Sequence, residues 1–135
     1  DSDGNLIEDY TPETSSQIEA KTSTWDAVQS GIRRVVTEGS AKSVFAGSHV
    51  EVAGKTGTAQ NRGHDHSVFM GFAPMNKPKI AIAVYVENGG WGATYGVPFG
   101  ALLMEQYLKG KLSPENELRA EEFSNRVILY GNEER

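Results

Sequence analysis

Three strand-like segments, residues 50–60, 66–73 and 80–86, follow one another in the middle of the chain. Only a few residues separate each segment from the next: Asn61-Arg62-Gly63 begins the first connection and Pro74 begins the second. Parallel neighbours need a long crossover connection, whereas antiparallel neighbours do not. The spacing therefore predicts three consecutive antiparallel strands, and the fold of this chain has to be built around that sheet.

The third segment is apolar on both of its faces. Ile80, Ile82, Val84 and Val86 alternate with Ala81, Ala83 and Tyr85. A strand with one face in water usually alternates apolar with polar residues, whereas a strand covered on both faces does not. We therefore expect protein to cover both faces of the sheet at this strand.

A helix is predicted before the sheet. Apolar residues recur there at helical spacing: Trp25, Val28, Ile32, Val35 and Val36. Ser23, with Asp26 three residues later, resembles a capping box, and Gly39 is typical of a helix end. We expect the tryptophan to anchor the helix in the core. Arg33 and Arg34 lie off the apolar stripe, which favours a solvated helix face.

Further helices are predicted after the sheet. A segment rich in Ala, Leu and Met indicates a helix from about Pro98 to Lys109, ended by Gly110. A short helix around Leu118 and an apolar run at residues 127–130 are expected in the acidic tail. Near the start of the chain, Asn5-Leu6-Ile7 predicts a short strand. Together these elements predict an α+β fold in which helices pack on an antiparallel sheet.

Composition narrows the function classes. The chain has 135 residues, enough for one modest domain, and contains no cysteine, which excludes disulfides, thiolate metal sites and cysteine nucleophiles. Its net charge of −5 argues against binding to nucleic acid. His64-Asp65-His66 has two histidines at a metal-like spacing, but a loop role is favoured because His49 is the only other histidine. No metal and no cofactor is expected.

The first predicted strand contains an unusual cluster of polar residues and glycines. Lys55 lies between Gly54 and Gly57, and glycines inside a strand suggest that a ligand or another backbone comes close. Thr56 and Thr58 alternate with the lysine, so their side chains point to the opposite face. An ammonium group and two hydroxyls at a strand edge suit a carboxylate ligand. An exposed lysine on an edge strand is the alternative that the residues alone leave open.

Gly54-Lys55-Thr56 also suggests a phosphate-binding loop. That motif needs a glycine five residues before its Gly-Lys pair, and His49 occupies that position. The residues after Thr56 do not begin a helix, as a phosphate-binding loop requires. Nucleotide binding is therefore disfavoured.

The segment Lys55 to Gln60 resembles the form of the Lys-Thr-Gly motif that is usual in class B penicillin-binding proteins. The order of the neighbouring segments is similar as well, with a helix at residues 25–36 before the motif, a strand at 66–74 after it, and a final helix after Pro98. The resemblance covers about residues 22–110, and the elongation-type subfamily, penicillin-binding protein 2, is the most similar.

The resemblance implies a D,D-transpeptidase that cross-links peptidoglycan stem peptides through a serine acyl-enzyme and is acylated by β-lactams. Lys55 would supply positive potential near the substrate carboxylate and the proton relay. Thr56 and Thr58 would bind that carboxylate, and the backbone N–H of Thr58 would be one oxyanion-hole donor. Gly57 would leave room for the acyl chain.

The other two motifs of the family, Ser-x-x-Lys and Ser-x-Asn, do not occur in this sequence. We therefore expect residues 1–112 to be the C-terminal part of a transpeptidase domain, with 1–20 as an extended N-terminal edge, 50–60 as the motif strand and 113–135 as an acidic tail. The rest of the domain would supply the serine, and the chain alone would be inactive. An upstream segment would anchor the protein at the extracytoplasmic face of the membrane, where membrane proteins of cell-wall synthesis are the expected partners.

Two alternatives remain open at this point. The same fold serves D,D-carboxypeptidases and β-lactamases, which hydrolyse their acyl-enzymes, although Thr58-Ala59-Gln60 after the lysine favours a transpeptidase. The second alternative is a non-catalytic β-lactam sensor domain.

Overall fold

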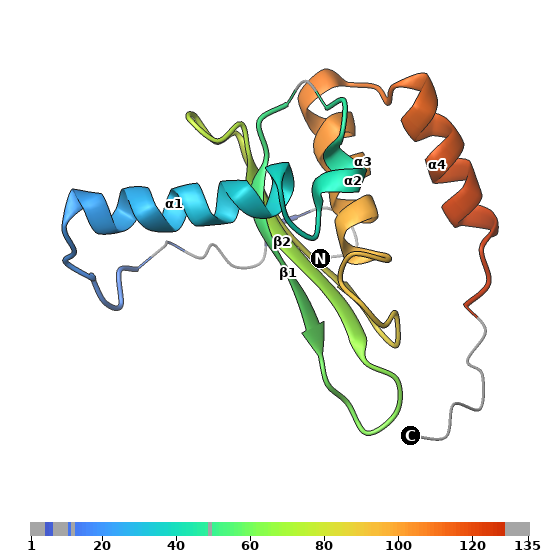
Figure 1. Ribbon diagram of the computed structural model, residues 1–135, viewed down its shortest axis with the longest axis horizontal. Coiled ribbons are helices and arrows are strands. Elements are labelled where there is room, and N and C mark those ends of the chain that lie inside the picture. Colours follow the sequence, from blue (N-terminus) through green and yellow to red (C-terminus); the bar gives the residue numbers. More distant parts are fainter. Residues whose placement is uncertain (1–4, 7–10, 12, 49, 129–135) are drawn as a thin grey trace.

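The computed structural model describes residues 5–6, 11, 13–48 and 50–128 (Figure 1). Four helices and three strands are found in that part of the chain. In sequence order they are α1 (Thr22–Thr37), α2 (Lys42–Phe45), β1 (Ala53–Ala59), β2 (His66–Ala73), β3 (Ile80–Val86), α3 (Gly96–Lys109) and α4 (Pro114–Asn125). The α+β class predicted from the sequence is confirmed.

The strands form one antiparallel sheet in the order β1-β2-β3, as predicted. β1 begins at Ala53, three residues later than the sequence pattern indicated, while β2 and β3 have the predicted bounds. Residues directly opposite one another share a face of the sheet. We call the side that carries Thr56, Phe69 and Val84 the covered face, and the side that carries Lys55, Met70 and Ala83 the open face.

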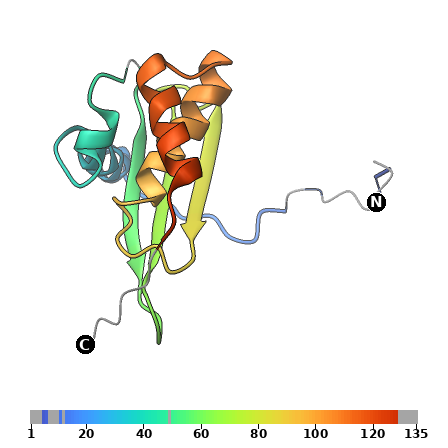
Figure 2. The ribbon, with the colours of Figure 1, turned by 90° about the vertical axis from the view of Figure 1, so that its right-hand side faces the viewer.

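The core lies on the covered face and is centred on Phe69, which is fully buried. Glycines let the strand and helix backbones approach its ring. A Cβ on Gly100 of α3 would lie 2.5 Å from a ring carbon of Phe69, and one on Gly54 of β1 would lie 2.8 Å from another. Phe45 of α2 contacts the same ring, with centroids 6.1 Å apart. In Figure 2, α3 and α4 lie on this side of the sheet.

Much of the open face is uncovered in the described part of the chain, although Ala53 at one end of it is fully buried. Met70 is 57% exposed and Tyr85 is 59% exposed, and Ala81 and Ala83 are exposed as well. The prediction that both faces of β3 are covered is therefore wrong for this part of the chain. The cause is that α2 and α3 both pack on the covered face, where Phe69 lies.

Helix α1 differs from the prediction at its start and along its apolar stripe. It begins at Thr22, and Lys21 occupies the N-cap position without a side-chain cap, so the predicted capping by Ser23 is wrong. Trp25 is 44% exposed, so it is not a core anchor here, and Val28 is 51% exposed. The helix extends beyond the sheet (Figure 1), so its first turns have no described neighbour to pack against.

The end of α1 is where it meets the rest of the molecule. The helix ends at Thr37, close to the predicted stop, and Val36 is its buried residue. Gly39 follows without a positive φ, and a Cβ there would lie 3.0 Å from the Cα of Val35. This glycine is therefore required for a close approach rather than for a left-handed backbone.

The two later helices largely match the prediction. α3 begins at Gly96, two residues before the predicted start, and ends before Gly110, which has the φ of 74° of a left-handed C-cap. α4 contains Leu118, as predicted, and Pro114 is in its first turn. No described helix is both long and apolar enough to span a membrane.

Two short segments predicted from the sequence are described only in part. Val127 and Ile128 form neither helix nor strand, and the rest of the run 127–130 lies outside the described residues. Asn5 and Leu6 also lack regular structure, and Ile7 is not among the described residues. The short strand predicted there stays a prediction.

Candidate active site

The Lys-Thr-Gly motif lies in β1, and β1 is an edge of the described sheet. The pairing register places Thr56 opposite Phe69 on the covered face and Lys55 opposite Met70 on the open face. Thr58 shares the face of Thr56. The strand therefore presents an ammonium group on one side of its edge and two hydroxyls on the other, as the alternation in the sequence predicted.

The backbone direction of β1 follows from a contact with the loop before α3. A Cβ on Gly92 would lie 2.4 Å from the carbonyl oxygen of Gly57 and 2.6 Å from that of Val68, so the two oxygens lie close together between the strands. Gly57 and Val68 are register partners, and this position of their carbonyl oxygens between the strands identifies them as a hydrogen-bonded pair. The alternate residues Thr56 and Thr58 then direct their N–H and C=O groups toward the edge that no described strand occupies.

The side chain of Lys55 lies along this edge. Its Nζ donates a 2.7 Å hydrogen bond to the carbonyl oxygen of Thr56, and the residue is exposed. This contact agrees with an outward-pointing carbonyl at Thr56. An exposed lysine on a flexible side chain can turn toward an anionic ligand at the same edge.

Ser40 contacts the motif from another part of the chain. It lies in the turn between α1 and α2, and its Oγ is 2.9 Å from Oγ1 of Thr56. No sequence pattern points to this residue, because a single serine after Gly39 carries no periodic or motif signal. The contact exists only because the end of α1 packs beside β1.

Arg33 joins α1 to the start of the motif strand. Its Nη1 donates a 2.5 Å hydrogen bond to the carbonyl oxygen of Val52, a residue that is 1% exposed. The expectation of a solvated Arg33 is therefore wrong, whereas Arg34 is exposed and pairs with Glu38 at 2.9 Å. Arg33 fixes the position of α1, and with it the turn that carries Ser40, relative to β1.

The loop between β3 and α3 is fixed to the sheet beside the motif. Ser67 of β2 is fully buried, donates a 2.8 Å hydrogen bond to the carbonyl oxygen of Trp91, and accepts a 3.0 Å bond from the N–H of Gly96. Ser67 lies opposite Thr58 in the register. The loop therefore holds Gly92 against Gly57, and Trp91 is 76% exposed nearby.

The two histidines of the metal-like spacing have different surroundings. His66 is 9% exposed, its Nδ1 accepts a 2.9 Å hydrogen bond from the N–H of Asn88, and its ring is 5.0 Å from that of Tyr85. His64 is exposed in the turn between β1 and β2. Within the described ranges, no group of three or more His, Cys, Asp or Glu side chains is arranged to hold a metal ion.

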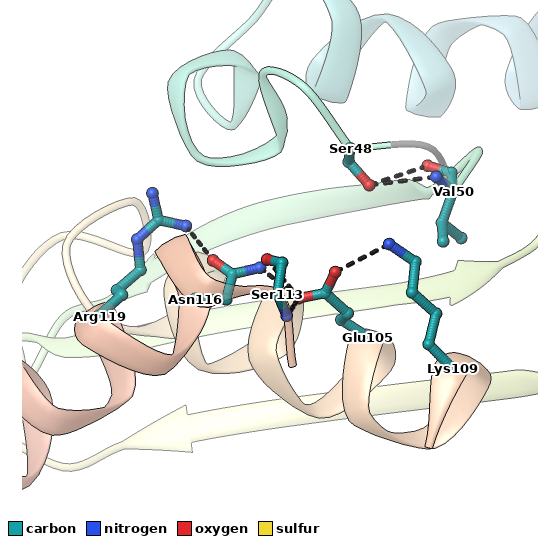
Figure 3. A network of polar contacts seen from close by, with 7 residues as sticks. All are labelled: Ser48, Val50, Glu105, Lys109, Ser113, Asn116 and Arg119. Atoms are coloured by element: carbon teal, nitrogen blue, oxygen red, sulfur yellow. Dashed lines mark hydrogen bonds and ion pairs between the residues drawn. The ribbon is translucent and has the colours of Figure 1, made fainter. Parts of the chain in front are cut away.

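A second polar cluster lies between α3 and α4, on Glu105 (Figure 3). Glu105 accepts hydrogen bonds from Nζ of Lys109 at 2.8 Å, from Nδ2 of Asn116 at 2.6 Å, and from both the N–H and the hydroxyl of Ser113 at 3.2 Å. Burial acts to raise the pKa of this carboxyl. The hydrogen bonds from Asn116, Lys109 and Ser113, with the charge of Lys109, outweigh burial and lower the pKa from 4.5 to about 2.

The Glu105 cluster joins helices and contains no residue of the motif. It lines a cavity of about 300 Å³ between the segment 44–50, α3 and the start of α4. At the other end of α4, Phe123 packs on Tyr95 and Phe99 of the α3 region, with centroids 6.0 Å and 5.1 Å away. These two contacts hold α4 against α3.

Comparison with known proteins identifies the family. The profile described as "Penicillin binding protein transpeptidase domain" matches residues 4–105, about three quarters of the chain. The chain belongs to this family. The resemblance seen in the motif and in the order of its flanking elements is thereby confirmed.

Several curated relatives of this transpeptidase-domain chain are named as peptidoglycan D,D-transpeptidases. The peptidoglycan D,D-transpeptidase MrdA of Haemophilus influenzae is 32% identical over 110 residues, which are 68% of this chain and 17% of the relative. The peptidoglycan D,D-transpeptidase PbpA of Mycobacterium tuberculosis is 38% identical over 73 residues, 46% of this chain and 15% of the relative. The chain spans about a sixth of the length of these curated relatives.

Solved structures of transpeptidases are similar in fold. Pseudomonas aeruginosa PBP2, in complex with WCK 5153, has 41% sequence identity and a TM-score of 0.67, over 84% of this chain and 26% of that one. PBP2 of Helicobacter pylori, in complex with MreC, has 32% identity and a TM-score of 0.56, over 67% of this chain and 18% of that one. The transpeptidase-domain chain therefore has the fold of part of a PBP2.

Proposed function

We propose that this chain is the part of a peptidoglycan D,D-transpeptidase that carries the Lys-Thr-Gly strand. The observation that supports this most directly is the edge of β1. There the ammonium of Lys55, the hydroxyls of Thr56 and Thr58 and the outward N–H of Thr58 lie along one strand edge. The names of the relatives, several of which are peptidoglycan D,D-transpeptidases, agree with it.

The proposed reaction has two acyl transfers. A serine from a part of the protein outside this sequence attacks the carbonyl carbon of the penultimate D-alanine of a stem peptide and forms an acyl-enzyme, while terminal D-alanine leaves. An amine of a neighbouring stem peptide then attacks the acyl-enzyme, forms the cross-link and releases the serine. A β-lactam would acylate the same serine.

Each motif residue has a proposed role at the strand edge. Thr56 and Thr58 donate hydrogen bonds from their hydroxyls to the terminal carboxylate of the substrate. The N–H of Thr58 stabilises the oxyanion of the tetrahedral intermediate, a kind of donor whose loss costs roughly 2.7–4 kcal/mol. Lys55 supplies positive charge to the carboxylate and to the proton relay, and Gly57, without a side chain, leaves room for the acyl chain.

The exposed apolar surface supports a further part of this proposal. Met70 and Tyr85 on the open face, and Trp25 on α1, are all more than two fifths exposed. We propose that the rest of the transpeptidase domain packs on these surfaces and brings the serine to the edge of β1. Lys55, which lies on the open face, would then face that serine-bearing part.

The location and partners of the protein are proposed from its relatives. The extracytoplasmic face of the cell membrane, where peptidoglycan is assembled, is the proposed location, with an anchor upstream of this sequence. PBP2 of P. aeruginosa has been solved with WCK 5153, and PBP2 of H. pylori with MreC. We propose β-lactam-type ligands and a cell-wall synthesis protein as partners of the complete protein here.

The test is acylation of the complete protein by a fluorescent penicillin. Lys55→Ala should slow acylation by about 100-fold, the effect expected when one group stabilising the transition state is lost. Lys79→Ala, an exposed lysine in the β2–β3 connection, is the matched control and should leave the rate unchanged. An unchanged rate in Lys55→Ala would remove the proposed role of this lysine.

Two further measurements separate the competing functions. The isolated 135-residue chain should gain no β-lactam mass, because it contains no Ser-x-x-Lys. With stem-peptide substrates, the complete protein should form cross-linked dimers. Hydrolysed peptide alone would instead indicate a carboxypeptidase, and stable acylation with no turnover of peptide would indicate a β-lactam sensor.

A further inference from the structure

We propose that Ser40 is a positioning residue for substrate binding, which directs the hydroxyl proton of Thr56 toward the substrate carboxylate. This inference rests on the proposed function and deepens it. Ser40 lies outside the motif, sixteen residues before Thr56, and its Oγ is 2.9 Å from Oγ1 of Thr56. Among the described side chains, Ser40 is a hydroxyl partner of the motif that comes from the turn between α1 and α2.

The number of protons on each group fixes the direction of the hydrogen bond between Ser40 and Thr56. A hydroxyl has a single proton to donate and can accept other hydrogen bonds at its oxygen, whereas an ionised carboxylate only accepts. When Thr56 binds a carboxylate, it must give that proton to the ligand. The 2.9 Å contact can then persist as a hydrogen bond only if Ser40 donates to Oγ1 of Thr56.

The resulting series of hydrogen bonds runs in one direction, from Ser40 to Thr56 and from Thr56 to the carboxylate. Hydrogen bonds in such a series polarise one another. The bond from Thr56 to the ligand is therefore strengthened when Oγ1 of Thr56 also accepts a hydrogen bond. Without Ser40, water would have to serve as that donor, and the hydroxyl of Thr56 would be free to rotate away from the ligand.

The backbone around Ser40 is fixed, which makes it suitable for this role. Ala41, the next residue, is fully buried, and its N–H donates a 3.1 Å hydrogen bond to the carbonyl oxygen of Val35. Gly39, the residue before, lies so close to α1 that a Cβ there would be 3.0 Å from the Cα of Val35. With both neighbours held, only the side-chain rotation of Ser40 remains to be ordered, which limits the entropic cost.

The experiment uses the complete protein and a peptide ending in D-Ala-D-Ala, with its free carboxylate or with a C-terminal amide. Ser40→Ala should raise KM for the free acid about three- to tenfold and change kcat little, because the lost interaction positions a binding group. The effect should be smaller for the amide, since an amide can also donate. Ser40→Thr keeps the hydroxyl and should restore KM.

A double-mutant cycle tests whether Ser40 acts through Thr56. Thr56→Val removes the hydroxyl at similar shape, and in that background Ser40→Ala should have no further effect on KM. Ser43→Ala, an exposed serine in α2, is the matched control and should behave as the unsubstituted protein. Thermal unfolding of each variant accompanies the kinetics.

The outcomes separate this inference from the function on which it rests. If Thr56→Val leaves KM unchanged, the proposed carboxylate role of Thr56 fails, and the inference fails with it. If Thr56→Val raises KM but Ser40→Ala does not, the proposed function stands and the inference is overturned. Equal losses from Ser40→Ala in both backgrounds, or no restoration by Ser40→Thr, would also overturn it, whatever the change in unfolding temperature.

Discussion

The two faces of the sheet are built from similar residues but have different surroundings. On the covered face, Phe69 is fully buried under α3, with Gly54 and Gly100 making room for its ring. On the open face, Met70, the next residue of β2, is 57% exposed. Two adjacent residues of β2 therefore differ completely in burial, because one points into the core and the other is more than half exposed.

The two faces therefore differ in how far elements of this chain cover them. The covered face has its own helices, and α4 adds a further layer through Glu105 and Phe123. The open face carries Lys55 together with apolar side chains that no described element covers. The motif strand lies at the boundary, with its hydroxyls on the complete side and its lysine on the other.

The largest expected effect is at the centre of the covered face. Phe69→Ala should lower the free energy of unfolding by about 3–5 kcal/mol, because it removes a buried ring and leaves a cavity. Met70→Ala, on the open face, should cost less than about 1 kcal/mol in the 135-residue chain. Urea unfolding measures both. Equal losses in this chain would contradict the contrast, and a larger loss for Met70→Ala in the complete protein would show that its open face is covered there.

The next expected effect on the free energy of unfolding concerns the packing of α4 against α3. Glu105→Gln should lower the free energy of unfolding at neutral pH by about 2–3 kcal/mol, because the carboxylate pKa falls from 4.5 in the unfolded chain to about 2 in the folded one. A lowered pKa stabilises the fold above pH 4.5, and this contribution is lost as the pH falls from 4.5 toward 2.

The pH dependence provides the check. Unfolding of the variant and of the unsubstituted chain, followed from pH 7 to pH 2, should converge at the acid end. Glu121→Gln, at an exposed position of α4, should change stability by no more than about 0.5 kcal/mol at any pH. A constant difference between Glu105→Gln and the unsubstituted chain across the range would show that the charge of Glu105 is not what stabilises the cluster.

A further effect on stability is expected at the contact between the loop before α3 and the motif strand. Gly92→Ala places a Cβ 2.4 Å from the carbonyl oxygen of Gly57, so the loop or the strand must shift, at a cost of about 1–3 kcal/mol. Because the strand carries Thr58, acylation of the complete protein should slow as well. Gly31→Ala, which meets nothing within 4 Å in α1, should be neutral or stabilising.

Much of the fold was predictable because it depends on local patterns. The alternation in residues 80–86 and the short connections gave the antiparallel sheet, and β2 and β3 have the predicted bounds. The start of α1 was not predictable from Ser23, since no side chain caps that helix. The exposure of Trp25 and of the open face also escaped prediction, because an apolar pattern specifies that a surface is to be buried and not which segment buries it.

The residues of the candidate site also fall into two groups, those that the sequence predicted and those that it did not. Lys55, Thr56, Gly57 and Thr58 were predicted as site residues from the sequence, because glycines and a lysine inside a strand are locally unusual. Ser40 and Arg33 were not, since their contacts with Thr56 and Val52 join segments that are distant in sequence. No local pattern encodes such a pairing.

The strands, the alternation of Lys55 with Thr56 and Thr58, and the family resemblance could be read from the sequence, since all three follow from residue types at fixed spacing. Three further features became visible only in the folded chain: the loop at Gly92 packs on Gly57, Thr58 directs its N–H to an edge, and Ser40 contacts Thr56. The physical reason is that packing between distant segments depends on the shape of the whole core, and above all on the space that glycines leave around Phe69.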